Sequence, residues 1–216
     1  MTDHIFRLIA TLAIVTAIVS LVSCSDLKNN PQTNPDNTNS SQVISDDFSN
    51  SKNKGTFYDA ENNVFITPYF RWEPPREWQG KFAYEISGNG TETSISLYEL
   101  PDYDRYKEAP EDYWYPGFIA NLSISEELPE EVAENTSGIV TKREWYNAGS
   151  YVLGTVKCEN EKLLYLLYTE PTDVQFDSED EKAAQNYMLI FERVGETVTN
   201  LKAEDDCSIT ILPASQ

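Results

Sequence analysis

Carboxylates are the side chains that this chain supplies most freely for chemistry. It has 36 Asp and Glu against 16 Lys and Arg, and a formal net charge of -20 at pH 7. The acids gather at residues 102–104, 111–112, 177–181 and 204–206. Oxygen-rich loops can hold calcium, but the spacing and central glycine of an EF-hand are missing, and acids at 177–181 suit a helix start, where the dipole favours them. We therefore predict solvated acidic faces and no metal site.

Catalysis by histidine is excluded for nearly the whole chain. Its one histidine is His4, so residues 24–216 cannot form a Ser-His-Asp, Cys-His or His-zinc arrangement. Two carboxylates can cleave a glycosidic bond without histidine, and Glu170 and Asp173 lie near the end of one predicted strand. A chain this acidic offers many such pairs, so the sequence singles out no catalytic residue and no cofactor.

Aromatic side chains are the best candidates for a binding surface. Tyr113, Trp114 and Tyr115 are three consecutive large rings, and in an extended segment they cannot all face one core because side chains alternate. Further rings lie at Trp72, Trp78, Tyr103 and Tyr106. Such rings stack on sugars or form the hot spots of protein interfaces. The alternative is that most of them are ordinary core residues.

The acidity also restricts the partners. A net charge of -20 repels the phosphate backbone of nucleic acids and anionic lipid headgroups. Nucleic-acid binding is therefore excluded, whereas an envelope protein or a glycan remains a possible partner.

The first cysteine stands in a pattern with its own chemistry. The apolar residues 8–22 follow a short start in which Arg7 is the one basic side chain, and they are too few to span a bilayer. The residues Leu21-Val22-Ser23-Cys24 resemble the lipobox of bacterial lipoproteins. The resemblance implies cleavage before Cys24 and a diacylglycerol thioether on its sulfur, with palmitate as a further acyl chain, and two or three chains anchor a protein stably. The alternatives are an ordinary secretory signal cut near residues 20–25 and an uncleaved anchor.

Two cysteines remain, Cys158 and Cys207. Outside the cytosol such a pair is a candidate disulfide. Two buried free thiols, as expected in an anaerobe, are an equal alternative.

Composition divides the chain into three parts. Residues 1–23 form the predicted signal peptide. Residues 24–55 contain the lipidated cysteine and then a polar run of Asn, Ser, Asp, Pro and Lys, which is typical of a disordered tether. Residues 56–216 have enough apolar side chains for one extracytoplasmic domain.

Strands dominate that domain. Short apolar or alternating runs predict strands at residues 64–66, 69–72, 81–87, 91–100, 118–125, 139–146, 151–158, 163–168 and 208–212. Gly88-Asn89-Gly90 predicts a hairpin turn between two of them. Residues 101–116 are interpreted as irregular, and residues 126–134 as an acidic turn or short helix.

A long helix is predicted near the C-terminus. Ser178 and Glu181 have the spacing of a capping box. Apolar residues then recur at three and four residues, at Ala184, Tyr187, Met188, Phe191, Val194, Val198 and Leu201. The predicted fold class is therefore α+β, a mainly antiparallel sheet with a long C-terminal amphipathic helix packed on one face.

Two further segments together resemble a group of known domains. They are Pro75-x-x-Trp78-x-Gly80-Lys81 and Pro171-Thr172-Asp173-Val174-Gln175-Phe176. Their order and spacing resemble those of secreted or lipid-anchored α+β domains of Gram-positive bacteria, over residues 64–201. The resemblance implies a Gram-positive source and an extracytoplasmic location, and it implies no activity.

These observations predict a lipoprotein on the extracytoplasmic face of a cell membrane, held there through Cys24. Its domain is predicted to be a binding or interaction module, with Tyr113, Trp114 and Tyr115 as the candidate surface. The alternatives are a histidine-free hydrolase that acts on glycans through an Asp/Glu pair, and a structural accessory subunit of an envelope complex.

Overall fold

A computed structural model describes residues 55–113, 115–159 and 162–214. Within these ranges the fold is mixed α/β, with three α-helices and eleven strands in two antiparallel sheets. The helices are α1 (Leu100–Glu108), α2 (Glu130–Thr136) and α3 (Glu181–Val198), with a 3₁₀-helix at Arg76–Trp78. The strands are β1 (Phe57–Asp59), β2 (Val64–Ile66), β3 (Phe70–Trp72), β4 (Phe82–Asn89), β5 (Glu92–Glu99), β6 (Phe118–Ser125), β7 (Glu144–Asn147), β8 (Ser150–Cys158), β9 (Leu163–Thr169), β10 (Lys202–Ala203) and β11 (Cys207–Ile211).

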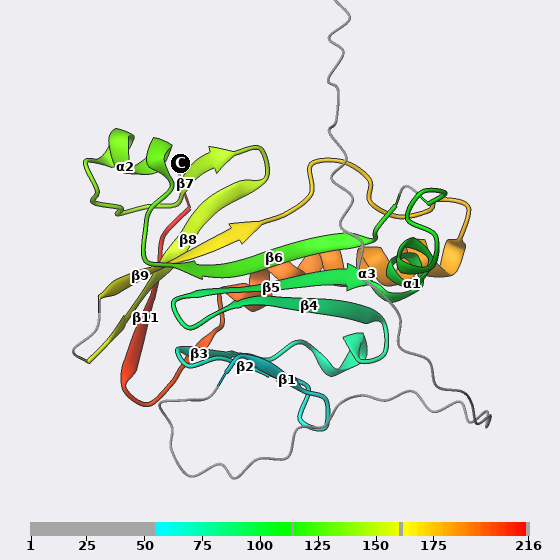
Figure 1. The fold of residues 1–216 in the computed structure, drawn as a ribbon, viewed down its shortest axis with the longest axis horizontal. Helices are drawn as coiled ribbons and strands as arrows, with labels where there is room; N and C mark the ends of the chain where they lie inside the picture. Colours follow the sequence, from blue (N-terminus) through cyan, green and yellow to red (C-terminus); the bar gives the residue numbers. More distant parts are fainter. Residues whose placement is uncertain (1–54, 114, 160–161, 215–216) are drawn as a thin grey trace, which may run out of the picture. The chain divides into compact units, whose positions relative to one another are not determined.

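The larger sheet has the strand order β11-β8-β9-β6-β5-β4, and β7 pairs with β8 beside β11 (Figure 1). The predicted hairpin at residues 88–90 joins β4 to β5. The two strands pair along their whole length, from Phe82 opposite Glu99 to Asn89 opposite Glu92. The smaller sheet has the order β1-β2-β3-β10. Most predicted strands are present within two residues of their expected bounds, because alternating burial is a strong local signal.

The larger sheet has two unlike faces. On β5, Thr93, Ile95 and Leu97 are buried, whereas Ser94 and Ser96 between them are half-buried. The face with the buried residues packs on α3, which lies behind β5 and β6 in Figure 1. We call this the core face and the opposite one the front face.

Helix α3 supplies the other half of the core. Its buried residues are Ala183, Tyr187, Ile190, Val194 and Val198. Four of them share one hydrophobic core with Ile95, Leu97 and Leu122 of the sheet. Met188, which the sequence places on the apolar face, is instead 39% exposed.

The start of α3 differs from the predicted capping box. Its N-cap is Asp180, whose carboxylate accepts hydrogen bonds from the amides of Lys182 and Ala183 at 3.0 Å each. Ser178 is therefore not the cap. An aspartate two residues later takes the role because its charge also suits the positive end of the helix dipole.

Two other segments differ from the sequence predictions. Residues 101–108, part of the segment 101–116 expected to be irregular, belong to α1, and of residues 139–146 only the last three belong to a strand, β7. Helix α1 was missed because Pro101 argues against a helix interior, although proline is favoured in a first turn, where its missing amide costs nothing. Helix α2 overlaps the second half of the predicted acidic turn or short helix at residues 126–134 and ends two residues past it.

The front face has its own small core at one end. Val132 of α2, Val152 and Leu212 are buried together there, with partly buried side chains packed around them at Leu128, Val140, Tyr146, Tyr165 and Leu167. This cluster fixes α2 over the β8–β9 end of the sheet. The front face of β5 and β6 is left without such a cover among the described residues (Figure 1).

Cys158 and Cys207 form a disulfide that joins β8 to β11. The two residues are direct cross-strand partners in the register of these strands. Of the two alternatives that the sequence leaves open, the structure has the bonded pair. Because β11 is the last of the described strands, the bond ties the segment after α3 to the sheet.

The membrane-related predictions lie outside the described residues. These are the signal peptide, Cys24 and nearly all of the tether. Within the part of the chain that the structure describes, no helix is both long and apolar enough to cross a bilayer.

Candidate functional site

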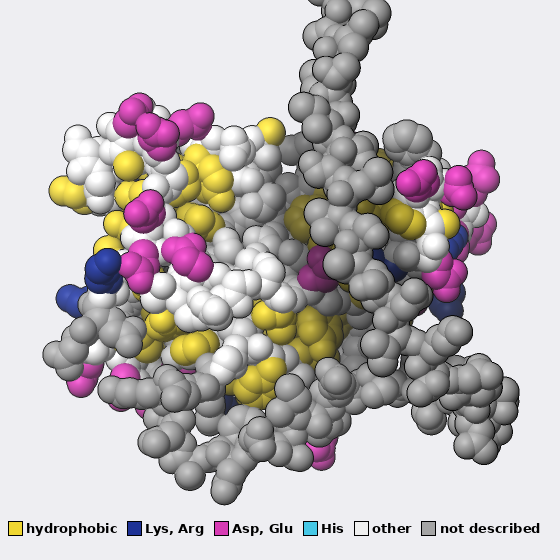
Figure 2. All heavy atoms as spheres, in the orientation of Figure 1, with side chains coloured by type: hydrophobic (Ala, Val, Ile, Leu, Met, Phe, Trp, Pro, Cys, Tyr) yellow, Lys and Arg dark blue, Asp and Glu magenta, His cyan; other side chains and the backbone are white. Residues whose placement is uncertain are grey.

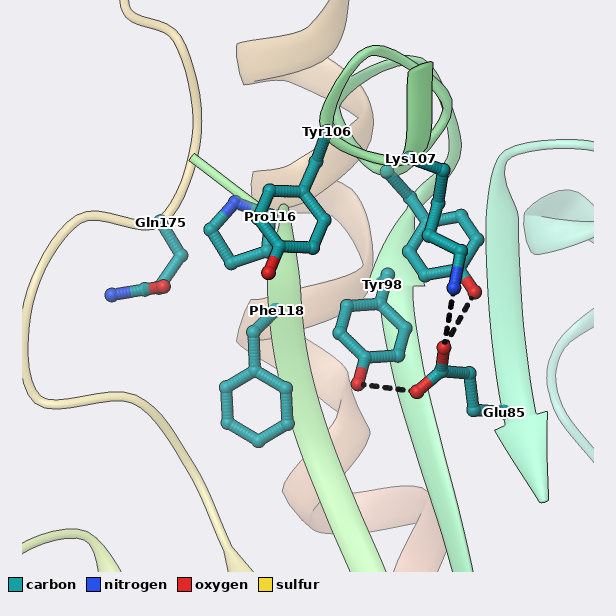
Figure 3. Close-up of a pocket in the computed structure, with 8 residues that line it drawn as sticks. Glu85, Tyr98, Tyr106, Lys107, Pro116, Phe118 and Gln175 are labelled. Carbon is teal, nitrogen blue, oxygen red and sulfur yellow. Dashed lines mark hydrogen bonds and ion pairs between the residues drawn. The ribbon is translucent and has the colours of Figure 1, made fainter. Parts of the chain in front are cut away.

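A pocket of about 490 Å³ opens on the front face where β4, β5 and β6 meet α1. We call it the tyrosine pocket (Figure 3). It is lined by Glu85, Tyr98, Tyr103, Tyr106, Lys107, Pro116, Phe118 and Gln175. Its size falls within the range of small-molecule sites, and like them it combines apolar and aromatic walls with few polar groups.

The floor of the pocket comes from neighbouring strands. Tyr98 of β5 is the direct cross-strand partner of Ala83 in β4 and of Phe118 in β6. This register places the rings of Tyr98 and Phe118 on the front face. The ring centroids of Tyr98 and Phe118 are 5.8 Å apart in an edge-on arrangement. A register shift between Leu97 and Tyr98 sets this pairing, so the irregularity aims Phe118 into the pocket.

The wall of the pocket comes from α1, which begins directly after β5. The carboxylate of Glu99 accepts a hydrogen bond from the amide of Asp102 at 2.9 Å and caps the helix. Tyr103, Tyr106 and Lys107 then share one side of α1, because residues three and four apart are neighbours on a helix surface.

Glu85 is the polar centre of the pocket. Its Oε1 accepts hydrogen bonds from Tyr103 Oη at 2.8 Å and Lys107 Nζ at 3.3 Å, and its Oε2 accepts one from Tyr98 Oη at 3.2 Å. The bond from Tyr103, with those from Lys107 and Tyr98, lowers the pKa of Glu85 against the opposing effect of burial. Glu85 is therefore charged at neutral pH, and Lys107 compensates its charge.

The rings around Glu85 hold one another in place. Tyr98 and Tyr103 have their centroids 4.7 Å apart, and Lys107 Nζ lies 5.4 Å from the centroid of Tyr103. Figure 3 shows the Tyr98 ring between Phe118 and the Glu85 carboxylate. These rings are half-buried, so each keeps some surface that a ligand can cover.

The other side of α1 carries two buried carboxylates with their partners, which we call the buried cluster: Glu99, Asp102, Arg105, Tyr113 and Asp180. Asp102 is fully buried, and its Oδ1 accepts hydrogen bonds from Tyr113 Oη at 2.5 Å and Arg105 at 3.2 Å. Arg105 also donates to Asp180 at 2.8 Å. The cluster therefore joins α1 to the N-terminus of α3.

Burial dominates the titration of the two fully buried carboxylates of this cluster. It raises the pKa of Glu99 to about 7, although the amide of Asp102 and the side chain of Asn186 stabilise the charged form. Burial likewise raises the pKa of Asp102, opposed by the hydrogen bond from Tyr113 and the charge of Arg105. Neither carboxylate lines the tyrosine pocket, so their role is to position α1.

The predicted surface at residues 113–115 is divided by the structure. Tyr113 is half-buried, with its hydroxyl on Asp102 and the Arg105 guanidinium 5.3 Å from its ring centroid. Tyr115 is 41% exposed, and Trp114 lies outside the described residues. Neither Tyr113 nor Tyr115 lines the tyrosine pocket, whereas Tyr103 and Tyr106, from the wider aromatic set, do.

The acidic clusters serve local structure where they are described. Asp102 and Asp180 pair with Arg105, and Glu204 pairs with Arg71. Asp173 accepts a hydrogen bond from Gln175 at 2.6 Å, and burial raises the pKa of Glu170. Across the described ranges, no three His, Cys, Asp or Glu side chains gather closely enough to hold a metal ion.

Sequence reasoning missed most of the pocket. Glu85, Tyr98, Lys107, Phe118 and Gln175 come from segments up to 90 residues apart, and no local pattern connects them. One signal was available, because Tyr103, Tyr106 and Lys107 have helical spacing directly after a proline in a first turn.

Comparison of the chain with protein-family models, with curated proteins and with solved structures finds no match.

Proposed function

We propose that this protein is a lipid-anchored extracytoplasmic binding module, and that its tyrosine pocket binds a sugar ring of an envelope glycan. The observation that carries the proposal is the set of four half-buried rings, Tyr98, Tyr103, Tyr106 and Phe118, around one carboxylate that is already hydrogen-bonded. Together they form a small concave site with fixed polar groups.

The chemistry of the lining suits a sugar. A pyranose has apolar C–H surfaces and a rim of hydroxyl groups, and tyrosine has an apolar ring with a polar tip. Rings can therefore cover the apolar surface while Glu85 and the tyrosine hydroxyls exchange hydrogen bonds with the rim. Because Lys107 compensates Glu85, the site offers hydrogen bonds without a net charge, which favours an uncharged ligand.

Binding is a better supported function for this pocket than hydrolysis. A glycoside hydrolase of the usual kind places two carboxyl groups on either side of the scissile bond. Among the described residues that line the pocket, Glu85 is the one carboxylate, and its lowered pKa makes it a poor proton donor at neutral pH. The hydrolase and accessory-subunit hypotheses gain no specific support from this geometry.

The proposal also includes the sequence predictions about helix α3, the lipid anchor, the tether and the source. We infer that α3 is the predicted amphipathic helix, because its buried residues recur at three and four positions while Glu181, Lys182, Glu192 and Arg193 are exposed. We also infer the anchor at Cys24, the tether and a Gram-positive source from the resemblances described above. With a lipid anchor at Cys24 and a tether after it, the pocket would lie outside the cell membrane, where envelope glycans are accessible.

The pocket is tested by retention of the full-length protein on insoluble cell-wall glycan. Tyr106→Ala removes a ring whose hydroxyl has no hydrogen bond among the described residues, so its main effect falls on the pocket. We expect wild type to be retained and Tyr106→Ala to be released. Tyr115→Ala is the matched control, because it removes an exposed tyrosine outside the pocket.

Loss of retention in Tyr115→Ala but not in Tyr106→Ala would move the interaction to the predicted surface at residues 113–115. No retention of any variant would refute the glycan proposal. The anchor is tested separately, since Cys24→Ser should release the protein from membranes and leave the precursor uncleaved.

A further inference from the structure

The front face beside the tyrosine pocket has an unusual composition for so acidic a chain. In the strand register, Ser96, Asn121 and Thr169 follow Glu85 directly across β5, β6 and β9. In the next row, Ser87 pairs with Ser94, and Ser94 with Ser123. We call these six uncharged residues the polar strip: Ser87, Ser94, Ser96, Asn121, Ser123 and Thr169.

The polar strip is accessible and lies between two covered regions. All six residues are half-buried or exposed. Figure 2 shows acidic side chains gathered over α2 and around α1, whereas the surface over the middle of β5 and β6 is mostly white, the colour of uncharged polar groups and backbone. An uncharged strip is notable because the chain has a formal net charge of -20.

The hydrogen bonds within the strip leave groups free for a ligand. Asn121 Nδ2 donates to Ser94 Oγ at 2.6 Å and to Ser96 Oγ at 2.8 Å. Both amide protons are thus engaged, and the side-chain oxygen of Asn121 makes no further hydrogen bond among the described residues. Ser94, which accepts from Asn121, keeps its own proton to donate. The strip therefore presents an ordered acceptor and donor side by side.

The strip continues directly from the tyrosine pocket. Glu85 lines the pocket and is also the cross-strand partner of Ser96. From β4 to β9 the strip crosses three strand spacings, or about 14 Å, which is longer than one sugar ring. A ligand held in the pocket can thus extend across the sheet without meeting an uncompensated charge.

We propose that the polar strip is a second part of the binding site and that the ligand is an extended, uncharged oligosaccharide. One ring occupies the tyrosine pocket, and the following rings cross β5, β6 and β9 over the strip. The inference rests on the proposed glycan binding and adds the length and charge of the ligand. A polyanionic glycan is disfavoured because acids surround the strip on both sides.

The test compares ligand lengths by isothermal titration calorimetry on the full-length protein. The probes are the dimer and the hexamer of β-1,4-linked N-acetylglucosamine, β-1,4-linked glucose and α-1,4-linked glucose. In the series that binds, we expect the hexamer to bind about tenfold more tightly than the dimer, as two or three further hydrogen bonds provide. Ser94→Ala combined with Asn121→Ala should remove this gain and change the dimer affinity much less, because only the second ring of the dimer reaches the strip.

Two further variants make the result independent of folding effects. Ser94→Tyr keeps a residue that suits a strand but covers the strip, so it should weaken the hexamer selectively. Asn200→Ala removes an exposed asparagine at the end of α3 and is the matched control.

Equal affinity for dimer and hexamer, with no effect of the Ser94 and Asn121 changes, would overturn the strip while leaving the pocket intact. Absence of binding by every probe would refute both the strip and the proposed function.

Discussion

Helix α1 contributes to two different sites, the tyrosine pocket on one side and the buried cluster on the other. On the pocket side, Glu85 is partly exposed and its tyrosine and lysine partners lower its pKa. On the other side, Glu99 is fully buried and its pKa is raised to about 7. Both carboxylates accept several hydrogen bonds, so the difference lies in desolvation and in the partner's charge.

This contrast separates recognition from positioning. The charge of Glu85 is compensated at the surface, where water can replace any lost partner, so the tyrosine pocket can change its contacts at little cost to stability. The two carboxylates at the centre of the buried cluster, Glu99 and Asp102, have no such substitute, because an unpaired buried charge is costly. The cluster should therefore set the stability of this region, and the pocket should set its affinity.

The largest expected effect comes from the residue that joins the two sides. Gly117 has φ of +70°, and a Cβ there would lie 2.9 Å from the carbonyl oxygen of Glu99 and from Cβ of Asp102. Gly117→Ala should lower the free energy of unfolding by roughly 3 kcal/mol through backbone strain and overpacking. It should also abolish glycan binding, because Pro116 and Phe118 line the pocket. Urea denaturation measures the first effect.

Gly80 provides the matched control for this substitution. It has φ of +76°, but a Cβ there would meet nothing within 4 Å. Gly80→Ala should therefore cost only the strain, about 1 kcal/mol. If the two variants lose equal stability, Gly117 is not packed against the buried cluster.

The second prediction uses the opposite pKa directions of the two carboxylates. Because folding raises the pKa of Glu99 from 4.5 to about 7, its proton is bound more tightly in the folded state. The contribution of Glu99 to stability is thus fully present below pH 4.5 and is lost as pH rises to about 7, by on the order of 3 kcal/mol. Glu99→Gln should flatten the stability profile over this window.

Glu85 should give the reverse result. Its pKa is lowered in the fold, so its contribution is present above its ordinary pKa and disappears as the solution is acidified below it. Glu85→Gln should change the stability profile only in acid. Urea denaturation of the three proteins across pH 3 to 8 is the measurement, and a Glu99→Gln profile parallel to wild type between pH 5 and 7 would contradict the burial argument.

The same contrast explains which parts of the fold the sequence could predict. The β4–β5 hairpin depends on Gly88-Asn89-Gly90, and the core of α3 depends on residues three and four apart, so both are local signals. Helix α1 has no apolar stripe to reveal it. It is held instead by Glu99, Asp102 and Arg105, whose contacts with Asp180 become visible only after folding.

The binding site was less predictable than the fold for a related reason. The three consecutive rings at residues 113–115 attract attention in the sequence, yet Tyr113 is used to hold Asp102. The rings of the tyrosine pocket are separated along the chain, and cross-strand register brings Tyr98 and Phe118 together. Register between distant strands follows from the whole sheet, so a local pattern cannot supply it.

The smallest predicted effect compares two tyrosine hydroxyl groups, one on each side of α1. Tyr113 donates to the buried Asp102 and Tyr103 donates to the exposed Glu85, at 2.5 and 2.8 Å. Tyr113→Phe leaves a buried carboxylate oxygen short of a donor and should cost about 2 kcal/mol. Tyr103→Phe should change stability by less than about 0.5 kcal/mol, because water and Lys107 replace the lost bond.

Binding should rank these two variants in the opposite order. Tyr103→Phe removes a hydroxyl from the pocket, so its affinity for the glycan should fall, whereas folded Tyr113→Phe should bind like wild type. Thermal denaturation and calorimetry on the same samples give both quantities. Equal losses of stability in the two variants would mean that solvent reaches Asp102 as readily as Glu85, and the separation of positioning from recognition across α1 would then be wrong.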